Sequence, residues 1–165
     1  MQSPTEEWEK KEIALWERFS SYSTEAFLAH IEELVAQLPE GHPLVPFERG
    51  CAFDSSGYPE LAIPQYREAI AKGISGLRKR RTSIQLASSL RNLGKLEESL
   101  SILEAELRSD PDELDGAVRG FLALVLHDQG RKDEALLHSL QALSVYLPRY
   151  NQSLFRYAGR LVDKR

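Results

Sequence analysis

The sequence predicts an all-α protein in which about nine helices pack as antiparallel pairs into an α-solenoid. Three observations support this fold class: a recurring glycine, a recurring pattern of small and large residues before it, and apolar residues at helical spacing. The recurring glycines are Gly57, Gly94 and Gly130, at intervals of 37 and 36 residues. A period of this length is typical of helical repeats, so we expect three repeated helix pairs.

The residues before each glycine suit a close contact between two helices. The residue seven positions before is small and the residue four positions before is large and apolar: Gly50, Ala87 and Ala123, then Phe53, Leu90 and Leu126. Small residues let antiparallel helices approach, and large ones fill the space beside the contact. The glycine can adopt the left-handed conformation that ends a helix. Because one pair cannot bury its apolar face alone, we expect the pairs to stack.

Two runs of residues resemble the tetratricopeptide repeat. They are Leu86-Ala87-Ser88-Ser89-Leu90-Arg91-Asn92-Leu93-Gly94 and Phe121-Leu122-Ala123-Leu124-Val125-Leu126-His127-Asp128-Gln129-Gly130-Arg131-Lys132-Asp133-Glu134-Ala135-Leu136. The resemblance covers roughly residues 44–147. The sequence departs from the family pattern where an aromatic residue is usual: Pro46, Ser83 and Arg119. The run from Tyr66 to Tyr150 also resembles a group of small bacterial tetratricopeptide proteins without an assigned activity.

The chain is expected to divide into residues 1–42, an N-terminal helical hairpin, and residues 43–165, three repeats with a C-terminal capping helix. The run Pro39-Glu40-Gly41-His42-Pro43 is the predicted turn between them. Ser3 is the predicted N-cap of the first helix. Asp110-Pro111-Asp112-Glu113 is expected to start the third repeat, and Pro148 the last helix.

The hairpin carries both tryptophans of the chain and a net charge of −6 before residue 41. We expect helix two to cover the first repeat, which leaves the side with Trp8, Trp16 and Tyr22 without a partner. Because a monomer rarely exposes a large aromatic patch, these residues predict the interface of a symmetric homodimer.

The resemblance implies a concave groove lined by the first helix of each pair, and groove positions follow from their distance to the turn glycine. They are Phe47, Cys51, Asp54 and Ser55; Arg81, Ile84, Ser88, Arg91 and Asn92; and Gly120, Leu124, His127 and Asp128. A groove of apolar, hydrogen-bonding and arginine side chains suits a peptide or a partner helix. Whether it is open or covered by the hairpin or a dimer mate stays open from the sequence.

Composition excludes several classes of protein. The 165 residues hold one cysteine, Cys51, so no intramolecular disulfide can form. No secretion signal and no run long enough to span a membrane is present, so we expect a cytoplasmic protein. No glycine-rich phosphate loop and no HExxH or GxSxG motif occurs, and the four histidines lack metal-ligand spacing. We therefore expect no enzyme activity, no metal and no cofactor.

The favoured hypothesis is a non-catalytic scaffold for protein–protein interaction that binds a peptide or partner helix in the groove. One alternative is a peptide-sensing regulator whose N-terminal hairpin responds to the bound peptide. Another is a nucleic-acid-associated protein that uses Arg78-Lys79-Arg80-Arg81 and the basic last helix. The net charge of −4 argues against the last of these. Partner and pathway stay open.

Overall fold

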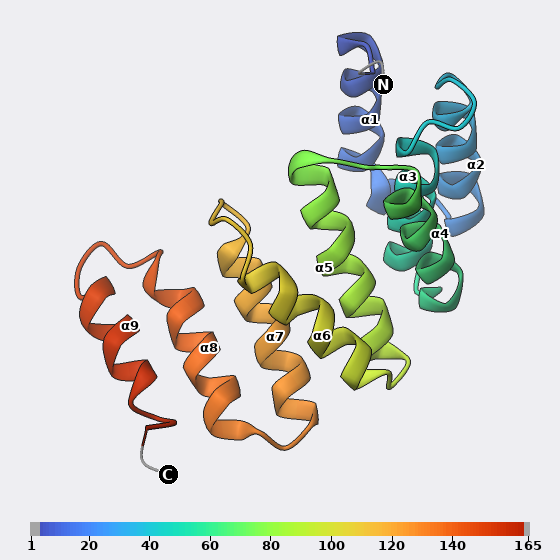
Figure 1. Ribbon diagram of the computed structural model, residues 1–165. Helices are drawn as coiled ribbons and strands as arrows, with labels where there is room; N and C mark the ends of the chain where they lie inside the picture. Colours follow the sequence, from blue (N-terminus) through green and yellow to red (C-terminus); the bar gives the residue numbers. More distant parts are fainter. Residues whose placement is uncertain (1–3, 164–165) are drawn as a thin grey trace. The chain divides into compact units, whose positions relative to one another are not determined.

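A computed structural model describes residues 4–163 and shows an all-α helical repeat fold (Figure 1). Nine α-helices, one short 3₁₀ helix and no strand occur in this range. The helices are α1 (Glu6–Glu17), η1 (Phe19–Ser21), α2 (Thr24–Val35), α3 (Leu44–Ser55), α4 (Pro59–Ala71), α5 (Gly76–Asn92), α6 (Leu96–Leu107), α7 (Asp115–Asp128), α8 (Lys132–Ser144) and α9 (Asn151–Gly159). The fold class and the number of helices predicted from the sequence are therefore confirmed. No helix in residues 4–163 is long and apolar enough to cross a membrane.

The three predicted turn glycines end α3, α5 and α7 in the same way. Gly57, Gly94 and Gly130 all have positive φ, between 73° and 84°. In each turn the amide after the glycine donates to the carbonyl of the large apolar residue four positions before the glycine, at 2.9 Å: Tyr58 to Phe53, Lys95 to Leu90, Arg131 to Leu126. This bond and the left-handed glycine form a Schellman motif, in which a Cβ would be strained. The sequence repeat is thus a repeat of one helix-ending turn.

The chain forms two compact units, Met1–Gln85 (unit 1) and Leu86–Arg165 (unit 2). The division falls inside α5, which is one continuous helix from Gly76 to Asn92. The boundary predicted after residue 42 lies within unit 1, where α2 packs on α3.

Unit 1 has its core between α2 and α3 and a second close contact between α3 and α4. Phe27, Ile31, Val35 and Ala52 form the buried cluster, and aromatic side chains from α1 and η1 pack against it. Between α3 and α4, a Cβ placed on Gly50 would lie 2.7 Å from two ring carbons of Tyr66. The small residue predicted at this repeat position therefore makes room for a buried tyrosine ring.

Unit 2 stacks helices pairwise, α6 on α7, α7 on α8, and α8 on α9 (Figure 1). Its core is apolar and fully buried, with Leu90, Leu103, Val118, Leu122 and Leu126. Ser99 of α6 is also fully buried, and its hydroxyl donates to the backbone carbonyl of Ala87 at 2.6 Å. A hydrogen bond from a side chain to the facing backbone requires close approach, which the small residues at both positions allow.

Three predicted helix starts are wrong. The first helix begins at Glu6 with Thr5 as N-cap, since the Thr5 hydroxyl accepts the Trp8 amide at 3.2 Å; the predicted N-cap Ser3 lies outside the described residues. The third repeat begins at Asp115, because the Asp112 carboxylate accepts the Leu114 amide at 2.7 Å and closes a turn two residues on. The last helix begins at Asn151, after a left-handed Tyr150, three residues beyond Pro148.

Candidate partner-binding site

The predicted groove positions of unit 2 lie on α5 and α7, and most are exposed. Asn92, Leu124, His127 and Asp128 are exposed, and Ser88 and Arg91 are half-buried. Leu124 keeps 44% of its surface accessible. Leu124, His127 and Asp128 are three and four residues apart on α7, so they share one helix face. This face of α7 therefore presents an apolar side chain next to two polar ones.

An ion pair connects the ends of α5 and α7. Arg91 Nε lies 2.6 Å from Asp128 Oδ2. The side chain of Arg91 is 25% exposed and that of Asp128 is 31% exposed. Asp128 is the last residue of α7, where the helix dipole disfavours a negative charge, and the arginine offsets this. Two residues that the sequence assigned to the groove on separate repeats are therefore brought together.

Three of the six predicted groove positions of unit 1 are buried, and Arg81 is exposed. Phe47, Cys51 and Ile84 are each no more than 5% exposed. The guanidinium of Arg81 lies over the Phe47 ring, 5.5 Å from its centroid, and the Gln85 amide nitrogen lies 3.5 Å from Cys51 Sγ. Their own neighbours cover these positions, so their contact with a partner stays a prediction. Asp54 is half-buried and Ser55 exposed.

Burial also makes Cys51 an unreactive thiol. It raises the pKa of Cys51 well above its usual range, and the charge of Glu48 adds to the rise. Because the thiolate is the nucleophile, a thiol with a raised pKa is inert. Among the described residues, no group of three or more His, Cys, Asp or Glu side chains is placed to hold a metal ion.

Glu48 of α3 is the site residue that the sequence analysis missed. It is 1% exposed, and its Oε2 accepts a hydrogen bond from Trp16 Nε1 at 2.9 Å, while Oε1 has no hydrogen-bond partner. Burial raises the pKa of Glu48 to about 7, against the Trp16 hydrogen bond and the charges of Arg81 and Arg78, which lower it; the charge of Glu12 raises it further. The sequence gives no signal for this burial, because Arg49 and Asp54, the other charged residues of α3, are only half-buried.

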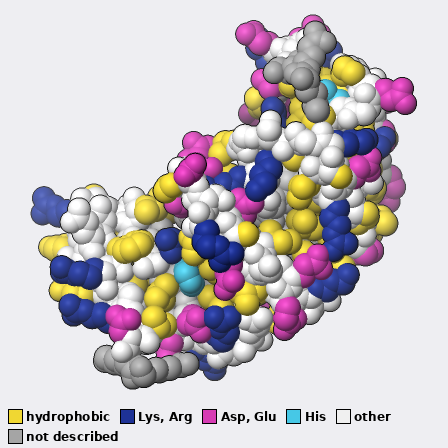
Figure 2. Space-filling model, viewed as in Figure 1, with side chains coloured by type: hydrophobic (Ala, Val, Ile, Leu, Met, Phe, Trp, Pro, Cys, Tyr) yellow, Lys and Arg dark blue, Asp and Glu magenta, His cyan; other side chains and the backbone are white. Residues whose placement is uncertain are grey.

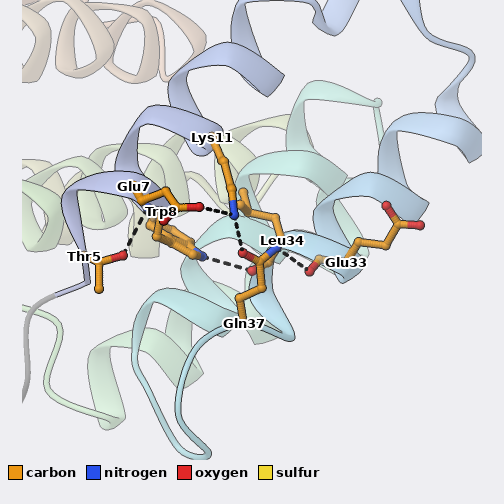
Figure 3. A network of polar contacts seen from close by, with 7 residues as sticks. All are labelled: Thr5, Glu7, Trp8, Lys11, Glu33, Leu34 and Gln37. Carbon is orange, nitrogen blue, oxygen red and sulfur yellow. Dashed lines mark hydrogen bonds and ion pairs between the residues drawn. The ribbon is translucent and has the colours of Figure 1, made fainter.

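Helix α1 is attached to the rest of unit 1 through its tryptophans. The Trp8 indole N–H donates to the carbonyl of Leu34 at 2.9 Å, near the end of α2, where this carbonyl also accepts the Gln37 amide at 3.2 Å (Figure 3). Lys11 Nζ donates to Gln37 Oε1 at 3.2 Å and pairs with Glu7 at 2.9 Å in the same network (Figure 3). Trp16 packs edge-to-face on Phe27, with ring centroids 5.0 Å apart.

The aromatic side of the hairpin is therefore not left without a partner, and that part of the sequence argument is wrong. Trp8 is only 4% exposed. Trp16 and Tyr22 are half-buried and pack against the core cluster of unit 1. The physical reason is that α1 packs on α2 and that Trp16 also reaches α3, where its indole N–H donates to Glu48. The homodimer stays a prediction, without an exposed aromatic patch to support it.

The arginine-rich run at the start of α5 does not form a single basic surface. Arg78 pairs with Glu9 at 3.2 Å, Arg80 is buried, and Arg81 lies over Phe47. Consecutive residues point around the whole circumference of a helix, which explains the dispersal.

The last helix presents arginines beside exposed aromatic rings. The guanidinium groups of Arg156 and Arg160 lie 5.4 and 5.0 Å from the centroid of the Tyr157 ring. Figure 2 shows basic and apolar side chains together around α9, at the left of the view. Cation–π contacts between the arginines and Tyr157 hold part of this surface in place.

A family model described as tetratricopeptide repeat matches residues 43–161, well over half of the chain. The chain belongs to the tetratricopeptide repeat family. Comparisons with curated proteins and with solved structures found no match. The family match agrees with the resemblance carried by the turn glycines and the small residues before them.

Membership of the tetratricopeptide repeat family suggests a scaffold for protein partners, since such families are generally non-catalytic. The match begins at residue 43, so α1 and α2 lie outside it. The attachment of α1 to α3 is thus a feature of this chain in addition to the family repeats.

Proposed function

We propose that this chain is a non-catalytic interaction scaffold that binds a peptide or a partner helix on α5 and α7 of unit 2. The observation that carries the proposal is the exposed Leu124 on one helix face with His127 and Asp128, beside Arg91. An apolar anchor gives binding energy, and the surrounding polar groups give register. The cytoplasmic location and the homodimer predicted from the sequence stay parts of this proposal. Light scattering of the full chain tests the homodimer, for which twice the monomer mass is expected.

A selection of displayed peptides against the full chain tests the scaffold function. A selected peptide should bind with micromolar affinity, and Leu124→Asp should weaken it at least about tenfold by removing the apolar anchor and adding a charge. The matched control is Leu136→Asp, since Leu136 of α8 is also an exposed leucine, at 47%. Equal loss of affinity in both variants, or in neither, would contradict the assignment of the site.

A second candidate function is a peptide-sensing regulator whose N-terminal hairpin responds to a bound peptide. The hydrogen bond between Trp16 of α1 and Glu48 of α3 favours it, because it links the hairpin to the first repeat. Both tryptophans of the chain lie in α1, so their fluorescence reports that helix alone. A selected peptide that binds without changing this emission would remove the regulator hypothesis and leave the scaffold.

A further inference from the structure

Helix α1 is an acidic helix of unit 1 that is bordered by two surface clefts. Two clefts of about 290 Å³ each lie between α1 and the α2 side of the unit. One is lined by Trp8, Leu38 and Pro39 and the other by Leu15 and Tyr22, and Lys11 and Gln37 line both. The hydrogen bond between Lys11 and Gln37 thus lies where the two clefts meet. Helix α1 is thus held by the packing of Trp8 and Trp16, while much of its remaining edge along α2 is bordered by open clefts.

The other side of α1 meets charges of opposite sign. Glu9 Oε1 lies 3.2 Å from Arg78 Nη1, and both side chains are partly exposed. The positive charges of Arg78 and Arg81 also act on Glu12, where they lower a carboxyl pKa that burial raises. With five glutamates and two lysines, α1 is an acidic helix on a surface with two arginines.

Trp16 completes this contact by reaching the buried carboxyl of Glu48. We call Glu48, Arg78 and Arg81 the docking face: Glu48 accepts the indole N–H of Trp16, Arg78 pairs with Glu9, and the charges of both arginines act on Glu12. Each of these contacts is a single polar interaction, and partly exposed ion pairs are weak. A helix that makes the same contacts from another chain would therefore compete with α1.

We propose that α1 occupies in cis a docking face for an acidic amphipathic helix of a partner protein, and that the partner helix exchanges with α1. The partner helix carries a carboxylate for Arg78 and, about two turns further on, a tryptophan for Glu48. This inference rests on the proposed function, that the chain binds a peptide or partner helix, and it adds a second site and the chemistry of the ligand. Binding in trans is weakened by the fraction of chains whose α1 is docked.

A peptide with the sequence of residues 4–22, labelled with a fluorophore, probes the face by anisotropy. The full chain and its Glu9→Arg variant are compared, because Glu9→Arg removes the cis ion pair and leaves Arg78 in place. The peptide should bind the Glu9→Arg chain about threefold tighter than the wild-type chain. Glu17→Arg, the same charge change at an exposed position of α1, is the matched control and should bind as the wild type does.

Charge reversal on the face gives an independent check. Arg78→Glu removes the ion pair from α1 in cis and from the labelled peptide in trans alike, so the unchanged peptide should bind about as it binds the wild-type chain, whereas a peptide with Glu9→Arg should bind the Arg78→Glu chain about threefold tighter. Tighter binding of the reversed peptide alone shows that the two side chains meet, which a folding defect in Arg78→Glu would not produce.

Displacement of α1 is visible in the full chain labelled with ¹⁵N, because its two indole N–H signals both come from α1. The unlabelled peptide should move both signals towards the positions of solvent-exposed indoles. Equal affinity of the Glu9→Arg and Glu17→Arg chains overturns the proposal, as does binding that leaves the indole signals unchanged or no saturable binding up to about 1 mM. Any of these results leaves the proposed function standing if a selected peptide still depends on Leu124.

Discussion

Replacing Glu48 by glutamine should change how the stability of unit 1 depends on pH. Glutamine keeps the size of the side chain and an oxygen that can accept the Trp16 indole N–H, but it cannot ionise. The carboxyl of Glu48 is 1% exposed, and burial raises its pKa from 4.5 to about 7. The folded state therefore prefers the protonated acid, and ionising it costs free energy.

The size and sign of the effect follow from linkage. Between pH 4.5 and about 7 the folded chain holds a proton on Glu48 that the unfolded chain has lost, so the free energy of unfolding falls as the pH rises. This contribution is fully present below pH 4.5 and is gone above about 7. Since one unit of pKa difference is worth about 1.4 kcal/mol, the loss is at most about 3 kcal/mol. Glu48→Gln should match the wild type at low pH and exceed it by up to this amount at pH 8.

Urea denaturation followed by tryptophan fluorescence measures the difference, because both tryptophans lie in unit 1. Only the difference between the two chains is used. The contributions of all other titrating groups are the same in both chains and cancel in this difference. One of these groups is His138: burial lowers its pKa to about 4, so its contribution to the free energy of unfolding rises with pH, opposite to that of Glu48. Glu17→Gln, at an exposed acid of α1, is the control and should stay parallel to the wild type. A constant difference between Glu48→Gln and the wild type from pH 5 to pH 8 would refute the reasoning.

Packing and burial predict three further outcomes. Gly50→Ala should destabilise unit 1 by about 1–3 kcal/mol, since the added Cβ would lie 2.7 Å from Tyr66. Gly120→Ala, whose Cβ would meet nothing within 4 Å, should stabilise the chain by up to about 1 kcal/mol through helix propensity. If urea titration finds Gly50→Ala the more stable variant, the Tyr66 ring moves aside at little cost. Ala87→Leu should lower the melting temperature, because Ala87 is fully buried, and an unchanged temperature would contradict the repeat alignment. Cys51 should react with a thiol reagent only as fast as the chain opens, so labelling at the rate seen in denaturant would contradict its burial.

The repeat could be predicted because it is local. The glycine, the carbonyl that its turn satisfies and the small residue that opens the helix contact all lie within eight positions of one another, so a self-alignment finds them together. Helix starts were harder because short polar side chains have competing partners. Asp112 satisfies the amide of Leu114 in a tight turn instead of capping a helix, and the pattern Asp-Pro-Asp-Glu fits either outcome.

The site was predictable only where the repeat itself defines the positions. The same counting from the turn glycine placed Arg91 and Asp128 at the ends of neighbouring helices, where the structure pairs them. The same counting wrongly predicted that Phe47 and Cys51 are accessible, because their burial depends on Arg81 and Gln85, which come from another helix. The contact of Trp16 with Glu48 joins residues 32 positions apart and outside the repeat pattern, so no periodicity points to it.

The charge state of Glu48 and the position of α1 are linked by the same contact. With α1 docked, Glu48 holds one indole hydrogen bond and is closed off from water, with Glu12, Arg78 and Arg81 as the charged groups that act on it. When α1 moves away, the carboxyl meets water, its pKa falls towards 4.5, and a proton is released near neutral pH. Because linkage is reciprocal, a lower pH must favour the docked helix by the same free energy. A partner helix whose indole reaches Glu48 would replace the hydrogen bond that α1 gives up and would bury the carboxyl again. The proton is therefore released only while neither helix occupies the docking face.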